Sequence, residues 1–239
     1  MELLVKQAPS QIELGAKTRE RLLDVGERLF ARHGFAATSV RQITRDAKCN
    51  VAAVNYHFGG KYNLYQEVFH RRLAVLREQR VTSIRQAMTP ASGTRALERV
   101  LTAFANAFLE PLVHESHGRD LIELWSREML DPVLPPDMVA TEIMRPVQQM
   151  LTDAIARFTP GVTPADARLC ALAVVAQLVQ VAHRMRRAEV TGRRDNDVRS
   201  LATVVNHLVR FSAAGARACR ESASRRTRAQ ATAIGQSRR

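Results

Sequence analysis

Residues 38–61, TSVRQITRDAKCNVAAVNYHFGGK, decide the fold of this chain, because they predict two short helices joined by a tight turn. Thr38 or Ser39 can cap the first helix, and Ser39 with Gln42 three residues later fits a capping box. Apolar residues recur at helical spacing, which predicts a buried face on each helix. Asn50 is a good cap for the second helix, residues 51–57. The stretch therefore predicts a helix-turn-helix.

The second of these helices leaves small or hydrogen-bonding side chains for its outer face. Such a helix suits the major groove of DNA, where small residues allow close approach and polar tips meet phosphates and base edges. Gly59 and Gly60 end the helix, and Lys61 opens the next one, where a cation and free backbone N–H groups can meet a phosphate. The residues expected to contact DNA are Thr38, Ser39, Arg41, Arg45, Asn50, Ala52, Ala53, Asn55, Tyr56, His57 and Lys61.

The same stretch resembles the helix-turn-helix of TetR-family transcriptional regulators. The matching positions are Gly34, Phe35, Thr38, Ile43, Ala47, Tyr56, His57, Phe58, Lys61 and Leu64. Lys48 departs from the pattern, because the family usually has glycine in this turn. A left-handed backbone at Lys48 would cost about 1 kcal/mol. The alternative interpretation is an ordinary pair of packed helices in an α-bundle.

The charge of the chain points to an anionic partner. Its 239 residues carry a formal net charge of +13 at pH 7. Residues 1–62 hold ten Lys/Arg against six Asp/Glu, and residues 216–239 hold seven against one. Such a chain suits nucleic acid or an anionic membrane surface, and charge alone does not decide between them.

Cysteine usage and hydropathy predict a cytoplasmic protein that does not enter a membrane. Cys49, Cys170 and Cys219 are far apart in sequence and form no CxxC pair, which is typical of a reducing compartment without a disulfide framework. The first residues contain too short an apolar run for a signal peptide. The most apolar segment, residues 169–182, is too short to span a bilayer.

Helical periodicity without any strand pattern predicts an all-α protein in four parts. We expect a flexible N-terminal arm at residues 1–16 and a three-helix DNA-binding domain at residues 17–62. Residues 63–215 are predicted to form a helical domain for ligand binding and dimerisation. Residues 216–239 have almost no large apolar side chain, so they are predicted to be a basic, disordered tail.

Individual helices follow from the same periodicity and from the positions of glycine and proline. The predicted helices are residues 17–33, which Gly34 stops, then 61–88, one that starts at 94, 121–130, 137–158, 164–189 and 195–214. Pro146 should kink or split the fifth of these long helices. The centre of the next one is apolar nearly all round, which predicts burial on more than one side. The arginines of helix 61–88 are expected to face out or pair locally: Arg71, Arg72, Arg77 and Arg80.

The second half of the chain resembles a TetR subgroup with a CecR-type regulatory domain. The resemblance lies in Trp125, Arg127, Glu128, Pro132, Arg145, Pro146 and residues 169–172. It implies that the last two helices pair with their copies in a second subunit, with an interface at Leu172, Val175, Val179, Leu201, Val205 and Leu208. It also implies a ligand pocket, for which the candidates are Phe104, Phe108, Trp125, Met129, Met144 and Gln177.

Other chemistry has weaker support. His114 and His117 flank a carboxylate, but they lack zinc-protease spacing and further ligands, so no metal or cofactor is expected. Cys49 in the turn is interpreted as a small, inert hydrophobe rather than a redox sensor. No nucleophile elbow, Walker loop or dinucleotide fingerprint is present, and we therefore expect no enzyme.

The combined interpretation is a cytoplasmic, homodimeric, TetR-like repressor. It would bind a palindromic operator in double-stranded DNA and be released by an unidentified small-molecule effector. Two rival classes were weighed: an all-α enzyme that uses the large helical domain, and a protein that coats DNA or a membrane surface without sequence specificity. The motif at Tyr56, His57 and Phe58 argues against both rivals.

Overall fold

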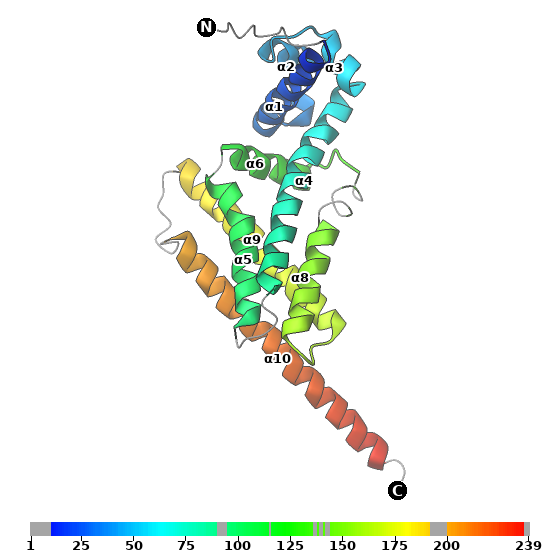
Figure 1. The fold of residues 1–239 in the computed structure, drawn as a ribbon, viewed down its shortest axis with the longest axis vertical. Coiled ribbons are helices and arrows are strands. Elements are labelled where there is room, and N and C mark those ends of the chain that lie inside the picture. Colours follow the sequence, from blue (N-terminus) through cyan, green and yellow to red (C-terminus); the bar gives the residue numbers. More distant parts are fainter. Residues whose placement is uncertain are drawn as a thin grey trace, which may run out of the picture. The chain divides into compact units, whose positions relative to one another are not determined.

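The computed structural model describes residues 11–89, 95–114, 116–135, 138, 141, 144–191 and 200–236, and it confirms the all-α class. Figure 1 shows the helices in order along the chain. Their bounds are α1 Gln11–Ala37, α2 Val40–Asp46, α3 Ala52–Phe58, α4 Lys61–Met88, α5 Ala96–His114, α6 Ser116–Leu130, α8 Arg145–Phe158, α9 Pro164–Thr191 and α10 Leu201–Gln236.

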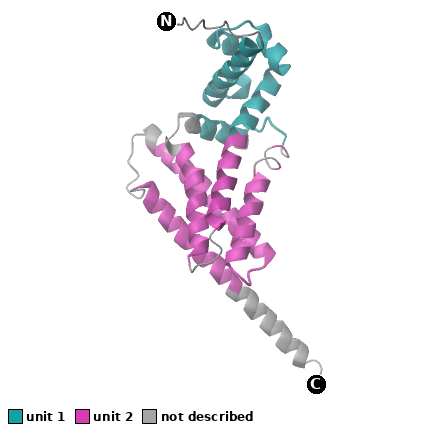
Figure 2. Cartoon of the chain, in the orientation of Figure 1, with its two compact units in different colours: residues 1–72, 120–135 teal, residues 73–119, 136–239 magenta. Residues whose placement is uncertain are grey.

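The chain divides into two compact units (Figure 2). Unit 1 comprises residues 1–72 and 120–135, and unit 2 comprises residues 73–119 and 136–239. Unit 1 thus takes in the first part of α4 and most of α6, both of which the sequence assigned to the regulatory domain. Helices α4 and α6 each contribute residues to both units.

The first helix ends where the sequence predicts. Gly34 has φ 78° and ψ 172°, which is not helical and which favours a residue without Cβ. At its other end α1 begins at Gln11, so the prediction of a loose arm through residue 16 is wrong for residues 11–16. Residues 1–10 of that arm lie outside the described part of the chain.

Unit 2 is a bundle in which α5, α8, α9 and α10 pack against one another. Its core contains Leu109, Leu151, Leu178 and Val205, each at most 2% exposed. Helix α9 buries one face in this core, and Leu169 and Leu172 on another face are 62% and 48% exposed. The prediction that this apolar helix is buried on more than one side is therefore wrong within a single chain.

Two helix ends in unit 2 bear on the sequence prediction. Pro146 lies in the first turn of α8, where its missing N–H has no helical partner to lose, so a helix starts at this proline, which agrees with the predicted split rather than with a kink. Helix α10 continues to Gln236, so the prediction of a disordered tail is wrong for residues 216–236, and residues 237–239 lie outside the described part of the chain. Ala216 is buried, and Arg217 Nη2 lies 2.5 Å from Glu98 Oε1 of α5. Alanine, arginine and glutamine are good helix formers, which explains the continuation.

Two of the three cysteines, although far apart in sequence, meet between α9 and α10. The Sγ atoms of Cys170 and Cys219 are 4.0 Å apart, and both cysteines are free thiols. Burial and the neighbouring Cys219 raise the pKa of Cys170 to about 11. The Cys170 thiol is therefore protonated at neutral pH.

Lys48, in the turn after α2, has a left-handed backbone conformation, with φ 52°. Its side chain is exposed. We predict that Lys48→Gly raises the free energy of unfolding by about 0.5–1 kcal/mol, because glycine adopts this conformation without strain but loses more entropy on folding. Urea denaturation of the two proteins measures the difference. Lys48→Ala is the matched control, and an equal stabilisation by alanine would contradict the backbone explanation.

Candidate nucleic-acid interface

In unit 1 a charged cluster joins α1 and α4, the two helices that flank the helix-turn-helix in sequence. Glu27 of α1 is fully buried, and its carboxylate oxygens lie 2.7 Å from Arg72 Nε and 3.1 Å from Arg71 Nη2. Arg71 also contacts Asp24 at 2.9 Å and Glu20 at 3.0 Å. A buried carboxylate is stable only with such partners. The predicted local pairing of Arg71 and Arg72 is thereby extended to a second helix.

The two short helices form as the sequence predicts. Ser39 is the N-cap of α2, and its Oγ accepts a hydrogen bond from Gln42 N at 3.1 Å. Asn50 Oδ1 accepts one from Ala52 N at 2.8 Å and so caps the start of α3. Gly59, with φ 74°, ends α3 in the left-handed conformation. Both predicted residues make the expected hydrogen bond, and Val51 stands between Asn50 and the first residue of α3.

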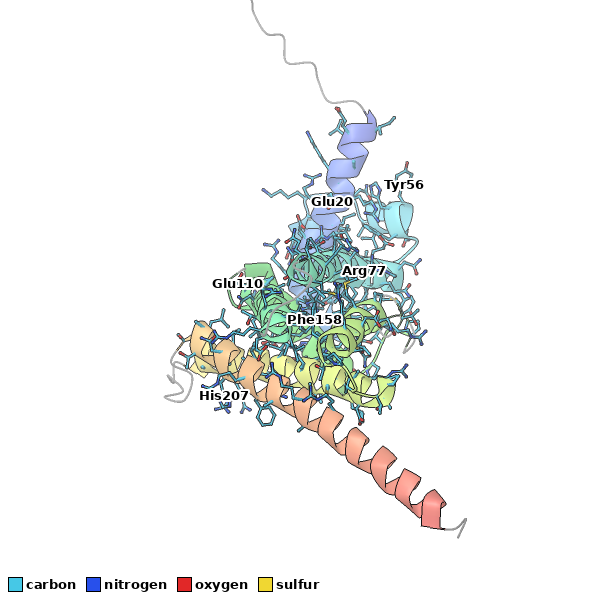
Figure 3. All side chains as sticks on the ribbon, turned by 60° about the horizontal axis from the view of Figure 1, so that its bottom comes forward. Glu20, Tyr56, Arg77, Glu110, Phe158 and His207 are labelled. Carbon is cyan, nitrogen blue, oxygen red and sulfur yellow. The ribbon has the colours of Figure 1, made fainter. Side chains whose placement is uncertain are left out.

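Helix α3 has one buried face and one free face. Val54 and Phe58 are buried, whereas Tyr56 is 85% exposed and stands clear of the ribbon in Figure 3. The edge of the His57 ring packs against the Tyr56 ring, with centroids 4.9 Å apart. Seven of the predicted contact residues are exposed: Ser39, Arg41, Arg45, Asn50, Ala52, Asn55 and Tyr56. Ala53 and His57 are half-buried.

Thr38 is not available to DNA. It is 1% exposed, and its hydroxyl donates to Gly34 O at 2.7 Å and to Leu29 O at 3.2 Å. Gly34 lies at the break in α1, where carbonyls lack helical N–H partners, and Leu29 lies more than one turn earlier in the same helix. Thr38 thus joins α1 to α2, and its predicted contact with DNA is wrong.

Lys61 has a similar structural role. Its Nζ donates to Phe35 O and to Thr38 O, each at 2.7 Å, and it lies 4.2 Å from the centroid of the Phe35 ring. Burial lowers the pKa of Lys61. The ammonium group has three donors and two of them are committed to the chain. The main role of Lys61 is therefore to bind two backbone carbonyls where α1 connects to α2. Its predicted role as a phosphate ligand is secondary.

The sequence analysis missed the role of the end of α6. Arg127 Nε and Nη2 donate to Ala31 O and Arg32 O, each at 2.9 Å, and so satisfy two carbonyls at the end of α1. A Cβ on Gly34 would lie 3.5 Å from the guanidinium. The signal was present, because Arg127 belongs to the motif that carries the CecR-type resemblance, but that motif gave no indication of a partner in α1.

Glu128 beside it binds α4. Its Oε2 accepts a hydrogen bond from the Tyr65 hydroxyl at 2.9 Å, and its Oε1 accepts from Val133 N and Leu134 N at 2.8 and 2.6 Å. Burial and this carboxylate raise the pKa of Tyr65, so the phenol stays protonated and remains a donor. Arg127 and Glu128 together fix α6 to the two long helices of unit 1.

Several other side chains of unit 1 also bear on the interface. Arg19 pairs with Glu67 at 2.5 Å, whereas Lys17 and Arg21 are exposed at the start of α1. Cys49 is half-buried and burial raises its pKa, which supports its interpretation as an inert residue. Exposed cations thus lie on α1, α2 and the turn: Lys17, Arg21, Arg41, Arg45 and Lys48. Basic side chains around a small, polar helix face suit the phosphates that flank a major groove.

The remaining candidate residues are divided between the units. Phe104 and Phe108 are buried in unit 2, where Met144 is 37% exposed and Gln177 is half-buried. Trp125 belongs to unit 1. The side chains of Met129, His114 and His117 lie outside the described part of the structure. Among the residues that are described, no group of three or more His, Cys, Asp or Glu side chains is placed to hold a metal ion.

A capped helix-turn-helix with an exposed α3, joined to a larger helical bundle, defines a DNA-binding regulator of the helix-turn-helix class. Residues 22–68 match the family profile "Bacterial regulatory proteins, tetR family", and residues 97–216 match "HTH-type transcriptional dual regulator CecR, C-terminal domain". The chain belongs to the TetR family of bacterial transcriptional regulators.

Individual relatives agree with this assignment. The chain is 26% identical over 164 residues to the dual regulator CecR of Shigella flexneri, covering 67% of this chain and 73% of that protein. It is 30% identical over 108 residues to the regulator AcrR of Shigella flexneri, covering 45% of this chain and 47% of AcrR. A solved structure of a transcriptional regulator from Pseudomonas aeruginosa PAO1 shares the fold, with TM-score 0.62, 21% identity, and 87% and 92% of the two chains covered.

The two carbonyl partners of Lys61 lead to a test. We predict that Lys61→Met lowers the free energy of unfolding by about 1–3 kcal/mol, because Phe35 O and Thr38 O lose a charged donor. Chemical denaturation gives this value. Tyr56→Phe, a change on the free face of α3, is the control and should leave stability unchanged. If Lys61→Met keeps full stability and only weakens DNA binding, Lys61 is a phosphate ligand after all.

Proposed function

We propose that this protein is a cytoplasmic, homodimeric repressor that binds a palindromic operator and is released by a small-molecule effector. The observation that carries the proposal is the free face of α3, on which Tyr56 is 85% exposed beside exposed Asn55 and Ala52. In a helix-turn-helix this helix enters the major groove, and the two helices of a dimer read two half-sites.

The faces of α9 and α10 that are left bare support a dimer. Leu169 and Leu172 on α9 and Phe211 on α10 are 62%, 48% and 64% exposed, and Ala173, Ala176 and Ala214 are exposed on the same two helices. Large exposed apolar side chains at helical spacing favour burial against a second copy, which would complete a four-helix contact.

This surface differs from the interface that the sequence predicted. Of the six predicted residues, only Leu172 is exposed, and Val175, Val179 and Leu201 are half-buried. Val205 and Leu208 are 2% and 7% exposed and belong to the core of the chain itself, so they are not interface residues. The apolar stripe of α10 that the sequence assigned to the interface packs on α5 and α9 of the same chain.

The apolar character of α9 has a second consequence. Residues Pro164–Met185 are long and apolar enough to cross a membrane by length and composition alone, and 28% of that stretch is buried. The predicted absence of such a stretch is therefore wrong. A second copy of the chain is the better partner, because α9 packs along α5, α8 and α10 and carries the half-buried Gln177 and exposed Gln180.

A substitution at Leu172 tests the proposed interface without changing the core, because Leu172 is exposed. We predict that Leu172→Glu gives a folded monomer, because an unpaired charge cannot be buried between two copies. Sedimentation velocity should show the mass of one chain, and circular dichroism should show unchanged helix content. Glu78→Gln, a charge change on α4, is the control and should stay dimeric. A Leu172→Glu protein that sediments as a dimer would exclude this interface.

Effector control requires that α3 respond to unit 2, and the described contacts suggest a route. Helix α6 ends in Arg127 and Glu128, which bind the end of α1 and Tyr65 of α4. An effector that prefers one position of α6 would therefore act on the helices that hold α2 and α3. By linkage, operator DNA must weaken effector binding by the same factor.

DNA binding itself is tested by gel shift with the DNA upstream of the protein's own gene, with random DNA as competitor. We predict a specific complex, and we predict that Arg45→Ala lowers the slope of log affinity against log salt by about one phosphate contact. Arg45 is 74% exposed and, among the residues that the structure describes, pairs with the adjacent Asp46, so its removal should not disturb the fold. Arg85→Ala on α4 is the matched control. No shift with competitor present, or equal slopes for all three proteins, would contradict the proposal.

A further inference from the structure

Arg80 occupies an apolar position in unit 2. The buried face of α4 in this unit consists of Leu73, Leu76, Arg80 and Ile84, and Arg80 itself is only 8% exposed. The predicted outward orientation of Arg80 is therefore wrong. Its spacing of four from Leu76 and of four to Ile84 places it on the inner face of the helix.

The guanidinium of Arg80 has no anionic partner in the described part of the chain. Its Cζ lies 3.9 Å from the centroid of the Phe108 ring of α5, and its buried Nε makes no hydrogen bond. Burial lowers the pKa of Arg80 to about 10, so the group remains charged at neutral pH. Arg71 and Arg72 on the same helix show the contrast, because both pair with Glu27 and Arg71 also pairs with Asp24 and Glu20.

The surroundings of Arg80 are apolar and held in place. Phe104 and Phe108 of α5 are buried and pack edge to face with centroids 5.9 Å apart. One turn further along α4, Ser83 Oγ donates to Ala103 O of α5 at 2.8 Å. An aromatic face stabilises a buried cation only in part, and the parallel N–H donors of a guanidinium fit a carboxylate or phosphate.

We propose that Arg80 binds the charged group of the effector, and that the effector is an organic anion with an apolar body. The carboxylate or phosphate would pair with the guanidinium, and the body would lie against Phe108 and the apolar side chains beside it. This inference rests on the proposed effector-controlled function, and it names the chemical class of the effector.

The test measures binding to the full chain without DNA, by isothermal titration calorimetry. The anions are octanoate, phenylacetate and octyl phosphate, and octanamide and phenylacetamide are their neutral counterparts. We expect at least one anion to bind, and to bind about 10- to 100-fold more tightly than its neutral counterpart. The carboxylates and the phosphate distinguish the two possible charged groups.

Variants of α4 then assign the preference to Arg80. Arg80→Met should remove it, Arg80→Lys should keep part of it, and the exposed Arg85→Met should keep all of it. Without ligand, Arg80→Met should also melt at a higher temperature than the natural protein, because an unpaired buried charge has been removed.

Three results would overturn the inference: no anion of the set binds, an anion binds Arg80→Met as tightly as the natural protein, or Arg80→Met melts at a lower temperature. The proposed function fails separately. If the anion binds through Arg80 but does not release operator DNA, the site stands and effector control by this anion is wrong. If operator binding is normal and no anion binds, the anion site is wrong.

Discussion

The structure of unit 1 depends on one buried carboxylate. Glu27 is inaccessible to solvent, and the two arginines that neutralise it are neighbours on α4, so α1 and α4 have one stable relative position. Removing either partner of such a pair leaves a buried charge, at a cost of several kcal/mol. The pair is therefore a strong constraint on orientation, and the short helices α2 and α3 are placed by the two helices that it joins.

Three further polar contacts pass this constraint on to the recognition helix. Thr38 and Lys61 donate hydrogen bonds to backbone carbonyls near the end of α1, and Arg127 donates to two more. Each of these side chains lies where a helix end would otherwise present unpaired C=O groups. The end of α6 thus takes part in the packing of the DNA-binding unit.

Local signals in the sequence predicted the helices and the caps at Ser39 and Asn50, because each depends on a few neighbouring residues. The partners of Lys61 and Arg127 could not be predicted, because their carbonyls belong to backbone far away in sequence. For Arg80 the spacing from Leu76 was available, but the expectation that arginine faces solvent outweighed it. Val205 and Leu208 were predicted at an interface but lie in the core of unit 2, because an apolar stripe in the sequence does not say which partner it packs on.

The central claim is that α3 reads DNA as one of a symmetric pair. It is tested most directly by selecting bound sequences from a pool of random duplex DNA with the full-length protein. The account predicts enrichment of an inverted repeat whose half-site centres lie one helical turn of DNA, or a multiple of it, apart. Enrichment of no sequence, or of a single site without two-fold symmetry, would contradict it.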